Sequence, residues 1–233
     1  MMKTDPMSEV WEKFAEVNAE FYILTDMKVD YSTPYGQKLF YDSGRYFVEK
    51  SFSSVKKYLK NNDRAIEIGC GIGRLTFPHS EIFNEVFAVD ISETMLRKLK
   101  NKAGDDSIDN IKTLMPHEKW DISEYFDYAY SFLVFQHIED FSKIQHYSQR
   151  IARSLRVDGI AQLQFDTRNE TLFYKIRNFL PDSFLPKTQH NGIKRIRRDP
   201  ELLRSVFKEN NLDIIREIAA ETELHTFILR KSK

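Results

Sequence analysis

The sequence feature that most restricts the fold is an apolar run followed at once by three closely spaced glycines. Residues 65–68 have the composition of a buried strand, and Gly69, Gly71 and Gly73 come directly after it. Because glycine has no Cβ, such a turn lets the backbone approach a ligand closely. Asp90 ends the next apolar run, about one strand–helix–strand unit later, where an acid can bind ribose hydroxyls. Together these features predict a site for an adenosine-containing cofactor.

The chain around this motif alternates between strand and helix patterns, which predicts an α/β fold with a mainly parallel sheet and helices on both faces. Strands are expected at residues 65–68, 85–89, 111–115, 126–133, 160–165, 212–218 and 224–229. Helices are expected at 74–83, 93–102, from 140 or 142 to 155, and at 201–209. Residues 220–223 are too short a link for a parallel crossover, so we expect the last two strands to form an antiparallel hairpin.

Two further segments frame this core. Residues 1–60, with helical apolar spacing at 10–21 and 45–59, are interpreted as an N-terminal helical cap within the same domain as residues 61–233. The many aromatic residues of the cap either bury area against the core or line a pocket for a flat or apolar ligand. Residues 167–200 contain three prolines and break the alternation, so they are interpreted as an irregular insertion on the substrate side.

The composition predicts a cytoplasmic protein that does not bind membranes. Lys plus Arg and Asp plus Glu both total 35, and this zero net charge speaks against nucleic acid as a partner. No apolar run approaches the roughly 20 residues that span a bilayer, and the first residues lack the apolar core of a signal peptide. The single cysteine, Cys70, excludes an internal disulfide and fits a reducing compartment. No metal site is expected.

Two residues near the glycines argue against a dinucleotide cofactor. Arg74 stands where a dinucleotide-binding loop needs a small residue for close helix–strand packing. Glu67, two residues before the first glycine, would repel a pyrophosphate in a shielded site. An acid at that position suits a ligand with a positive charge and no phosphate, although a nicotinamide-dependent dehydrogenase remains an alternative.

S-Adenosylmethionine has these properties, and the chain resembles the class I S-adenosylmethionine-dependent methyltransferases of the small-molecule group described as methyltransferase domain 11/25. The resemblance is carried by four blocks in the family's order, at residues 67–76, 89–96, 126–131 with 134–138, and 152–159. It implies a Rossmann-like three-layer sandwich whose seven-stranded, mostly parallel sheet ends in an antiparallel C-terminal hairpin strand. The hairpin expected from the short link agrees with this architecture.

The resemblance also implies a role for individual residues. Gly69, Gly71 and Gly73, with Cys70 between them, would let the loop approach the methionine part of the cofactor. Glu67 would lie near its amino group, and Asp90 would accept hydrogen bonds from both ribose hydroxyls. The other cofactor contacts fall to Ile91 and Met95 beside the adenine, to the backbone at Met115, and to Ser131 and Phe132 beneath the sulfonium. Met95 could equally be a plain core residue.

Methyl transfer from a sulfonium is an in-line displacement, so positioning of the nucleophile can supply much of the rate. A base is needed only where the acceptor must lose a proton. His137, just beyond the fourth strand, is the candidate base, and the alternative is a histidine that packs beside the cofactor. Gln136 and Arg45 are candidate substrate-side residues. Arg45 could also lie near the cofactor carboxylate or simply begin an exposed helix.

The sequence favours O- or N-methylation of a small molecule, anionic or aromatic. No Asn-Pro-Pro-Tyr-like tetrapeptide follows the fourth strand, and Cys70 lies in the glycine loop rather than where a nucleophilic thiolate would be needed. A basic cluster either binds an anionic acceptor or forms a solvated face; it consists of Lys187, His190, Lys194, Arg195, Arg197 and Arg198. The alternatives are a catalytically inactive methyltransferase-like binding or scaffold protein, and a methyltransferase acting on RNA or protein.

Overall fold

The computed structural model describes residues 6–25, 28–172, 174, 176, 180–185 and 192–233. The strands are β1 (Arg64–Ile68), β2 (Glu85–Val89), β3 (Ile111–Leu114), β4 (Phe126–Ser131), β5 (Leu155–Phe165), β6 (Leu212–Ile218) and β7 (His225–Lys231). The α-helices are α1 (Pro6–Leu24), α2 (Pro34–Ser53), α3 (Thr76–Ser80), α4 (Glu93–Asp105), α5 (Phe141–Ser154) and α7 (Pro200–Glu209). Three 3-10 helices are η1 (Lys56–Tyr58), η2 (Phe135–His137) and η3 (Asp182–Phe184).

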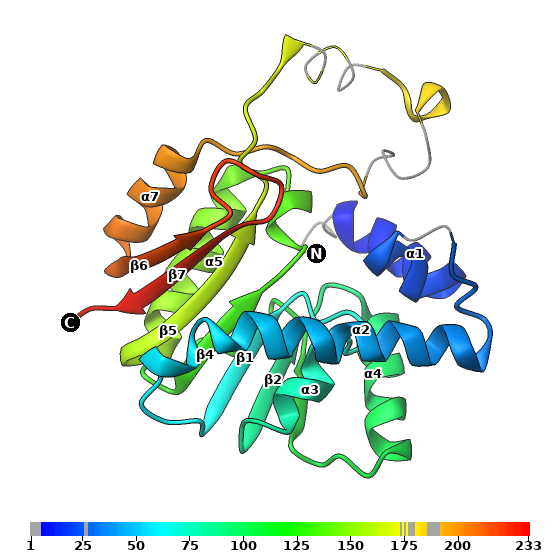
Figure 1. The fold of residues 1–233 in the computed structure, drawn as a ribbon, viewed down its shortest axis with the longest axis horizontal. Coiled ribbons are helices and arrows are strands. Elements are labelled where there is room, and N and C mark those ends of the chain that lie inside the picture. The colour runs from blue at the N-terminus through cyan, green and yellow to red at the C-terminus, as the bar shows by residue number, and fades with distance from the viewer. Residues whose placement is uncertain (1–5, 26–27, 173, 175, 177–179, 186–191) are drawn as a thin grey trace.

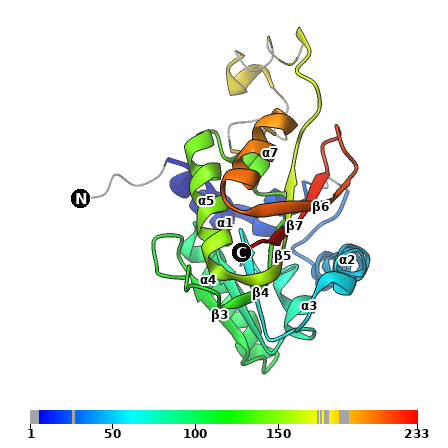
Figure 2. The same cartoon turned by 90° about the vertical axis from the view of Figure 1, so that its left-hand side faces the viewer.

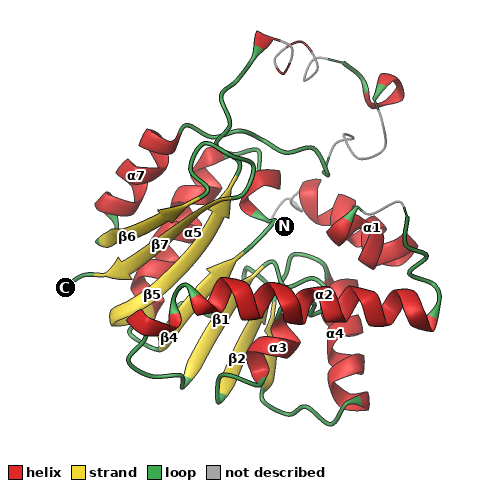
Figure 3. Cartoon of the chain, viewed as in Figure 1, coloured by secondary structure: helices red, strands yellow, loops and turns green. Residues whose placement is uncertain are grey.

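The strands form one seven-stranded sheet in the order β3-β2-β1-β4-β5-β7-β6, with helices against both faces (Figures 1 and 3). The pairs β1–β2, β1–β4, β2–β3 and β4–β5 are parallel. Strand β7 lies between β5 and β6 and runs antiparallel to both, which confirms the predicted hairpin. The strand order reverses between β1 and β4, and loops leaving the carboxyl ends of strands at such a reversal diverge to form a crevice.

Alternation of side chains along the strands separates the core into two faces. On one face, Ile144 of α5 and Leu203 of α7 pack with Ile66 of β1. On the other face, Val48 of α2 packs in a cluster with Tyr128 of β4, and α3 belongs to the same layer. Figure 2 shows the two layers, with α5 and α7 on one side of the sheet and α2 and α3 on the other. The predicted three-layer α/β sandwich is therefore confirmed.

Helix α1 lies across the carboxyl ends of the central strands (Figure 1). Its Ala15 and Ala19 pack in a cluster that also contains Met95 of α4. The Glu12 carboxylate accepts hydrogen bonds from Ser92 Oγ at 2.6 Å and from the Thr94 backbone N–H at 3.2 Å. Since these groups stand at the N-terminus of α4, the carboxylate also interacts favourably with the helix dipole. These contacts dock α1 onto α4.

Several element boundaries differ from the predicted ones. Helix α2 begins at Pro34, not at residue 45, because Thr33 caps it by accepting a hydrogen bond from the Gly36 N–H at 3.0 Å. Proline suits the first turn of a helix, where its missing N–H costs nothing. Helix α3 is shorter than the predicted 74–83 and contains Pro78. Strand β5 begins at Leu155 rather than at residue 160, directly after α5.

The described part of the 167–200 insertion is tied to the core by its own arginines. Arg195 contacts the Glu223 carboxylate at 3.1 Å, and Arg197 stacks over the Tyr174 ring at 4.3 Å. Arg198 donates to the Ile138 carbonyl at 2.5 Å. These arginines of the basic cluster thus contact groups of the chain itself, while Lys187 and His190 lie outside the described residues. In the part of the chain that the structure describes, no helix is long and apolar enough to cross a bilayer.

Candidate functional site

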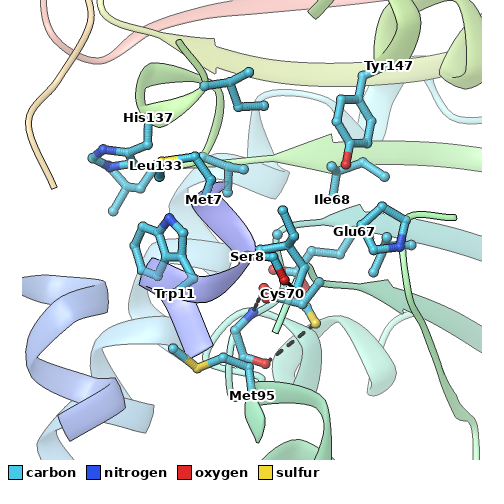
Figure 4. Close-up of a pocket in the computed structure, with 18 of the residues that line it drawn as sticks. Met7, Ser8, Trp11, Glu67, Ile68, Cys70, Met95, Leu133, His137 and Tyr147 are labelled. Carbon is cyan, nitrogen blue, oxygen red and sulfur yellow. Dashed lines mark hydrogen bonds between the residues drawn. The ribbon is translucent and has the colours of Figure 1, made fainter. Parts of the chain in front are cut away.

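A cavity of about 760 Å³ opens at the strand-order reversal, between the carboxyl ends of β1, β2 and β4 and helix α1. Figure 4 shows Met7 and Trp11 of α1 on the side of the cavity near His137, and Tyr147 on the opposite side. The structure brings ten of the residues proposed from the sequence to this cavity: Glu67, Gly69, Cys70, Gly71, Asp90, Ile91, Met95, Met115, Phe132 and His137.

The glycine loop needs glycine for two separate reasons. Gly69 has φ +79°, and a Cβ there would lie 2.2 Å from Val134 Cγ2, in the loop after β4. Gly71 has φ +54°, and its Cβ would lie 2.8 Å from Ile23 Cδ1 of α1. Positive φ is costly for residues with a side chain, and the close neighbours leave no space for one. The loop backbone is therefore held between the end of β4 and the N-terminal helix.

Asp90 joins the loops that follow β1 and β2. Its Oδ2 accepts a hydrogen bond from the Gly71 N–H at 2.8 Å, and its Oδ1 accepts one from the Ser92 N–H at 3.0 Å. Ser92 in turn caps α4 by accepting from the Met95 N–H at 3.1 Å. Burial raises the pKa of Asp90, while these backbone hydrogen bonds oppose the rise. Each carboxylate oxygen has two lone pairs, so both oxygens keep an acceptor position for a ligand hydroxyl.

Glu67, on β1, is 3% exposed. Its Oε2 accepts hydrogen bonds from Thr76 Oγ1 at 2.6 Å and from the Tyr130 hydroxyl at 3.0 Å. Burial raises the pKa of Glu67 to about 7, and the two hydrogen bonds oppose the rise. A carboxyl group poised near neutrality becomes more acidic when a cation binds beside it. The site can therefore respond to a cationic ligand by ionising.

His137, in η2, is fixed by contacts to both ring nitrogens. Nδ1 lies 3.3 Å from the Lys194 carbonyl oxygen, so this nitrogen carries the proton and donates. Nε2 lies 3.2 Å from Gln136 Nε2 and accepts from it. The ring also meets Trp11 edge to face, with 5.8 Å between centroids. Burial lowers the pKa of His137 to about 4, so the imidazole is neutral at physiological pH.

Four residues proposed from the sequence do not line the cavity. A Cβ at Gly73 would meet the Phe77 ring at 2.7 Å, which indicates a packing role. Ser131 Oγ donates to the Ile68 carbonyl at 2.9 Å and joins the ends of β4 and β1. Gln136 is buried behind His137. Arg45 donates two hydrogen bonds of 2.5 Å to Glu81 on the surface.

Other cavity residues escaped the sequence-based reasoning. Met7 and Ile23 reach the cavity because α1 crosses the sheet edge, a long-range packing result that helical spacing does not contain. Trp11 also lines the cavity, in line with one of the two interpretations of the aromatic residues of the cap. Leu133 also lines the cavity. Its φ is +61°, a conformation that favours glycine, and a leucine at this position gives no indication of such a turn. Arg74 was noted only for excluding a dinucleotide, yet it lines the cavity with 6% of its surface exposed. Its position directly after the third glycine was the available signal.

Comparisons with known proteins agree with this geometry. Residues 65–159 match the family model described as "Methyltransferase domain". No curated protein matches the chain. A S-adenosylmethionine-dependent methyltransferase from Clostridium acetobutylicum is 18% identical, with a TM-score of 0.61 over 96% of this chain and 100% of that chain. Magnesium protoporphyrin IX methyltransferase from Synechocystis PCC 6803, solved with bound S-adenosylhomocysteine, is 16% identical, with a TM-score of 0.62 over 95% of this chain and 97% of that chain.

A S-adenosylmethionine-dependent methyltransferase from Methanosarcina mazei is 14% identical, with a TM-score of 0.60 over 76% of this chain and 96% of that chain. The matched segment spans the glycine loop, Asp90, and the strand and loop that carry His137. Residues 65–159 are therefore similar to the methyltransferase domain family, and the chain shares its fold with these S-adenosylmethionine-dependent methyltransferases.

Proposed function

We propose that this protein uses S-adenosylmethionine to methylate an oxygen or nitrogen atom of a small-molecule acceptor. The observation that carries the proposal is a pair of carboxyl groups, the buried Glu67 and the half-buried Asp90, at the ends of adjacent strands with the glycine loop between them. Two acids in one shielded cavity favour a ligand with hydroxyls and positive charge over a phosphate-bearing one. The structural neighbours with bound S-adenosylmethionine or S-adenosylhomocysteine support the same choice.

Each residue has a definite task in this proposal. Asp90 would accept hydrogen bonds from the ribose hydroxyls with its remaining lone pairs, and Ile91 and Met95 would pack against the adenine. Met115 lines the same side of the cavity, at the end of β3. Glu67 faces the ammonium group of the methionine part. The bound cofactor supplies an activated methyl group, and the chain supplies its orientation.

The acceptor half of the cavity is apolar and aromatic. Its described lining includes Met7, Trp11, Leu133, Val134 and Ile138. Such walls exclude water and favour a flat or apolar acceptor. Lys143 and Glu139 also reach the cavity and offer polar groups to a substituted acceptor.

Cofactor binding is tested by calorimetric titration of the full chain with S-adenosylmethionine. We expect D90A to weaken binding by about 2–3 kcal/mol, because the variant loses charge-assisted hydrogen bonds to two hydroxyls. The matched variant D90N keeps the side-chain shape and one acceptor, so its loss should be smaller. Absence of wild-type binding at about 1 mM would refute the proposal. Thermal stabilisation by NAD but not by S-adenosylmethionine would favour a dehydrogenase instead.

His137 is our candidate for receiving the acceptor's proton. Burial lowers the pKa of His137 to about 4, so the neutral, proton-accepting form is present throughout the physiological range. In this proposal the acceptor displaces the Gln136 amide from Nε2, the nitrogen that takes the proton. We expect H137A to lower turnover about 10²-fold while S-adenosylmethionine affinity stays unchanged. Release of S-adenosylhomocysteine in the presence of a panel of phenols, carboxylic acids and amines measures turnover. Equal turnover of H137A and wild type with an accepted substrate would assign the histidine a packing role.

A further inference from the structure

Arg74 is a buried cation on the wall of the cofactor cavity. It follows Gly73, lines the cavity and is 6% exposed. Helix α2 approaches its backbone so closely that a Cβ at Gly44 would lie 2.0 Å from the Arg74 carbonyl oxygen and 2.8 Å from Arg74 Cγ. This contact fixes the base of the side chain. The guanidinium is therefore a built part of the site rather than a surface group that happens to lie near it.

The Arg74 side chain has no hydrogen-bond or ion-pair partner among the residues that the structure describes. Its Nε is buried without an acceptor. The guanidinium carbon lies 5.7 Å from the centre of the Phe47 ring, and the Glu67 carboxylate attracts it without direct contact. Desolvation lowers the pKa of Arg74 to about 10, which leaves it protonated at neutral pH. An unpaired buried charge is costly, so binding of an anion beside it is favourable.

Glu67 and Arg74 line one cavity with opposite charges that do not pair with each other. Two donors, Thr76 and Tyr130, occupy one oxygen of the acid, and no acceptor within the described residues occupies Arg74 Nε. A ligand group that carries both an ammonium and a carboxylate matches this arrangement. An α-amino acid group is the smallest such zwitterion. Guanidinium–carboxylate hydrogen bonds are also among the strongest that a protein forms.

We propose that Arg74 binds the carboxylate of the α-amino acid end of the cofactor, opposite an ammonium that faces Glu67. The inference rests on the proposed function, because S-adenosylmethionine supplies that zwitterion. Arg74 thereby takes the role that the sequence suggested for Arg45, binding of the cofactor carboxylate. The Arg45 guanidinium instead donates to both carboxylate oxygens of Glu81 on the surface. The sequence offers two arginines for the cofactor carboxylate, and their surroundings in the fold separate them.

The test compares two ligands on one protein. Decarboxylated S-adenosylmethionine keeps the nucleoside, sulfonium and ammonium and lacks only the carboxylate. We expect full-length wild type to bind it about 30- to 100-fold more weakly than S-adenosylmethionine in calorimetry. R74Q should weaken S-adenosylmethionine by a similar factor and change the affinity for the decarboxylated ligand less than threefold. R74K should fall between, because it keeps the charge without the planar fork.

R45Q is the matched control, and we expect it to bind both ligands as wild type does. Equal wild-type affinity for the two ligands would overturn the assignment, as would loss of S-adenosylmethionine affinity in R45Q but not in R74Q. Thermal melting of each ligand-free variant checks its folding, and R74M repeats the comparison if R74Q is unstable. If wild type binds neither ligand, the proposed function itself fails, which is a different result from equal binding of both.

Discussion

The E67Q variant tests whether the buried acid beneath the glycine loop costs the protein stability at neutral pH. Burial raises the pKa of Glu67 from 4.5 to about 7, whereas the unfolded chain keeps the ordinary value. Between pH 4.5 and 7 the folded state therefore retains a proton that the unfolded state has released. The contribution of Glu67 to the free energy of unfolding therefore falls as pH rises through this window. The gap between the two values corresponds to roughly 3 kcal/mol.

Glutamine at position 67 has no proton to lose, so E67Q escapes this decline. Its side-chain oxygen can still accept from Thr76 and Tyr130, which donate to Oε2 in the wild type. Urea denaturation of both proteins at intervals from pH 4.5 to 8 gives the difference in unfolding free energy. Relative to wild type, the unfolding free energy of E67Q should increase by about 3 kcal/mol between the acid and the alkaline end of this range.

E81Q is the control, because the effect of its substitution on stability should change with pH in the opposite direction. Glu81 is paired with Arg45, and its pKa is lowered, so E81Q should lose stability relative to wild type above pH 4.5. A difference between E67Q and wild type that stays constant with pH would refute the assignment of a raised pKa to Glu67. The same outcome would remove the reason to expect the acid to respond to a cationic ligand.

Two further perturbations address the core around the site. His79 is fully buried, with Nε2 lacking a partner among the described residues, and burial lowers its pKa to about 4. The unfolding free energy should therefore fall as pH drops from 6.5 to 4. In urea titrations, H79F should remove about 3 kcal/mol of that loss. The same loss in H79F and wild type over this pH range would contradict the prediction. G69A should cost about 3 kcal/mol by thermal or urea unfolding, because the added Cβ combines a positive φ with a clash against Val134. G69A/V134A should recover part of the loss, and a merely additive double variant would show that this contact is not the cause.

Local signals in the sequence predicted most helix starts and the sheet. The starts of α4 and α5 were predicted because Ser92 and Asp140 cap them, and an N-cap is a short-range hydrogen bond within one segment. The hairpin also followed from a local fact, the length of the link between two strands. The start of α2 at Pro34 was missed because proline is common both in turns and in the first turn of a helix.

The sequence predicted cavity residues best where they lie at the end of an expected strand, as Met115 and Phe132 do. Gly69 and Asp90 were found because glycine and an acid are needed there whatever surrounds them. Trp11 and Arg74 were not assigned to the cavity, since a tryptophan in a helix and an arginine after a turn have many possible surroundings. Their roles depend on how α1 and α2 pack across the sheet, and that is a property of the whole fold.

The position of β7 between β5 and β6 sets an order of events during synthesis. Strand β6 leaves the ribosome before β7 but pairs with β7 alone, so it cannot join the growing sheet by itself. Until residues 225–231 emerge, β5 remains an open edge. Gln164 of β5 also accepts a hydrogen bond from the Leu133 N–H at 3.2 Å and so supports a loop that lines the cavity. The nascent chain can thus assemble its glycine loop early, whereas the edge of β5 beside this loop is covered late, by a slow long-range pairing.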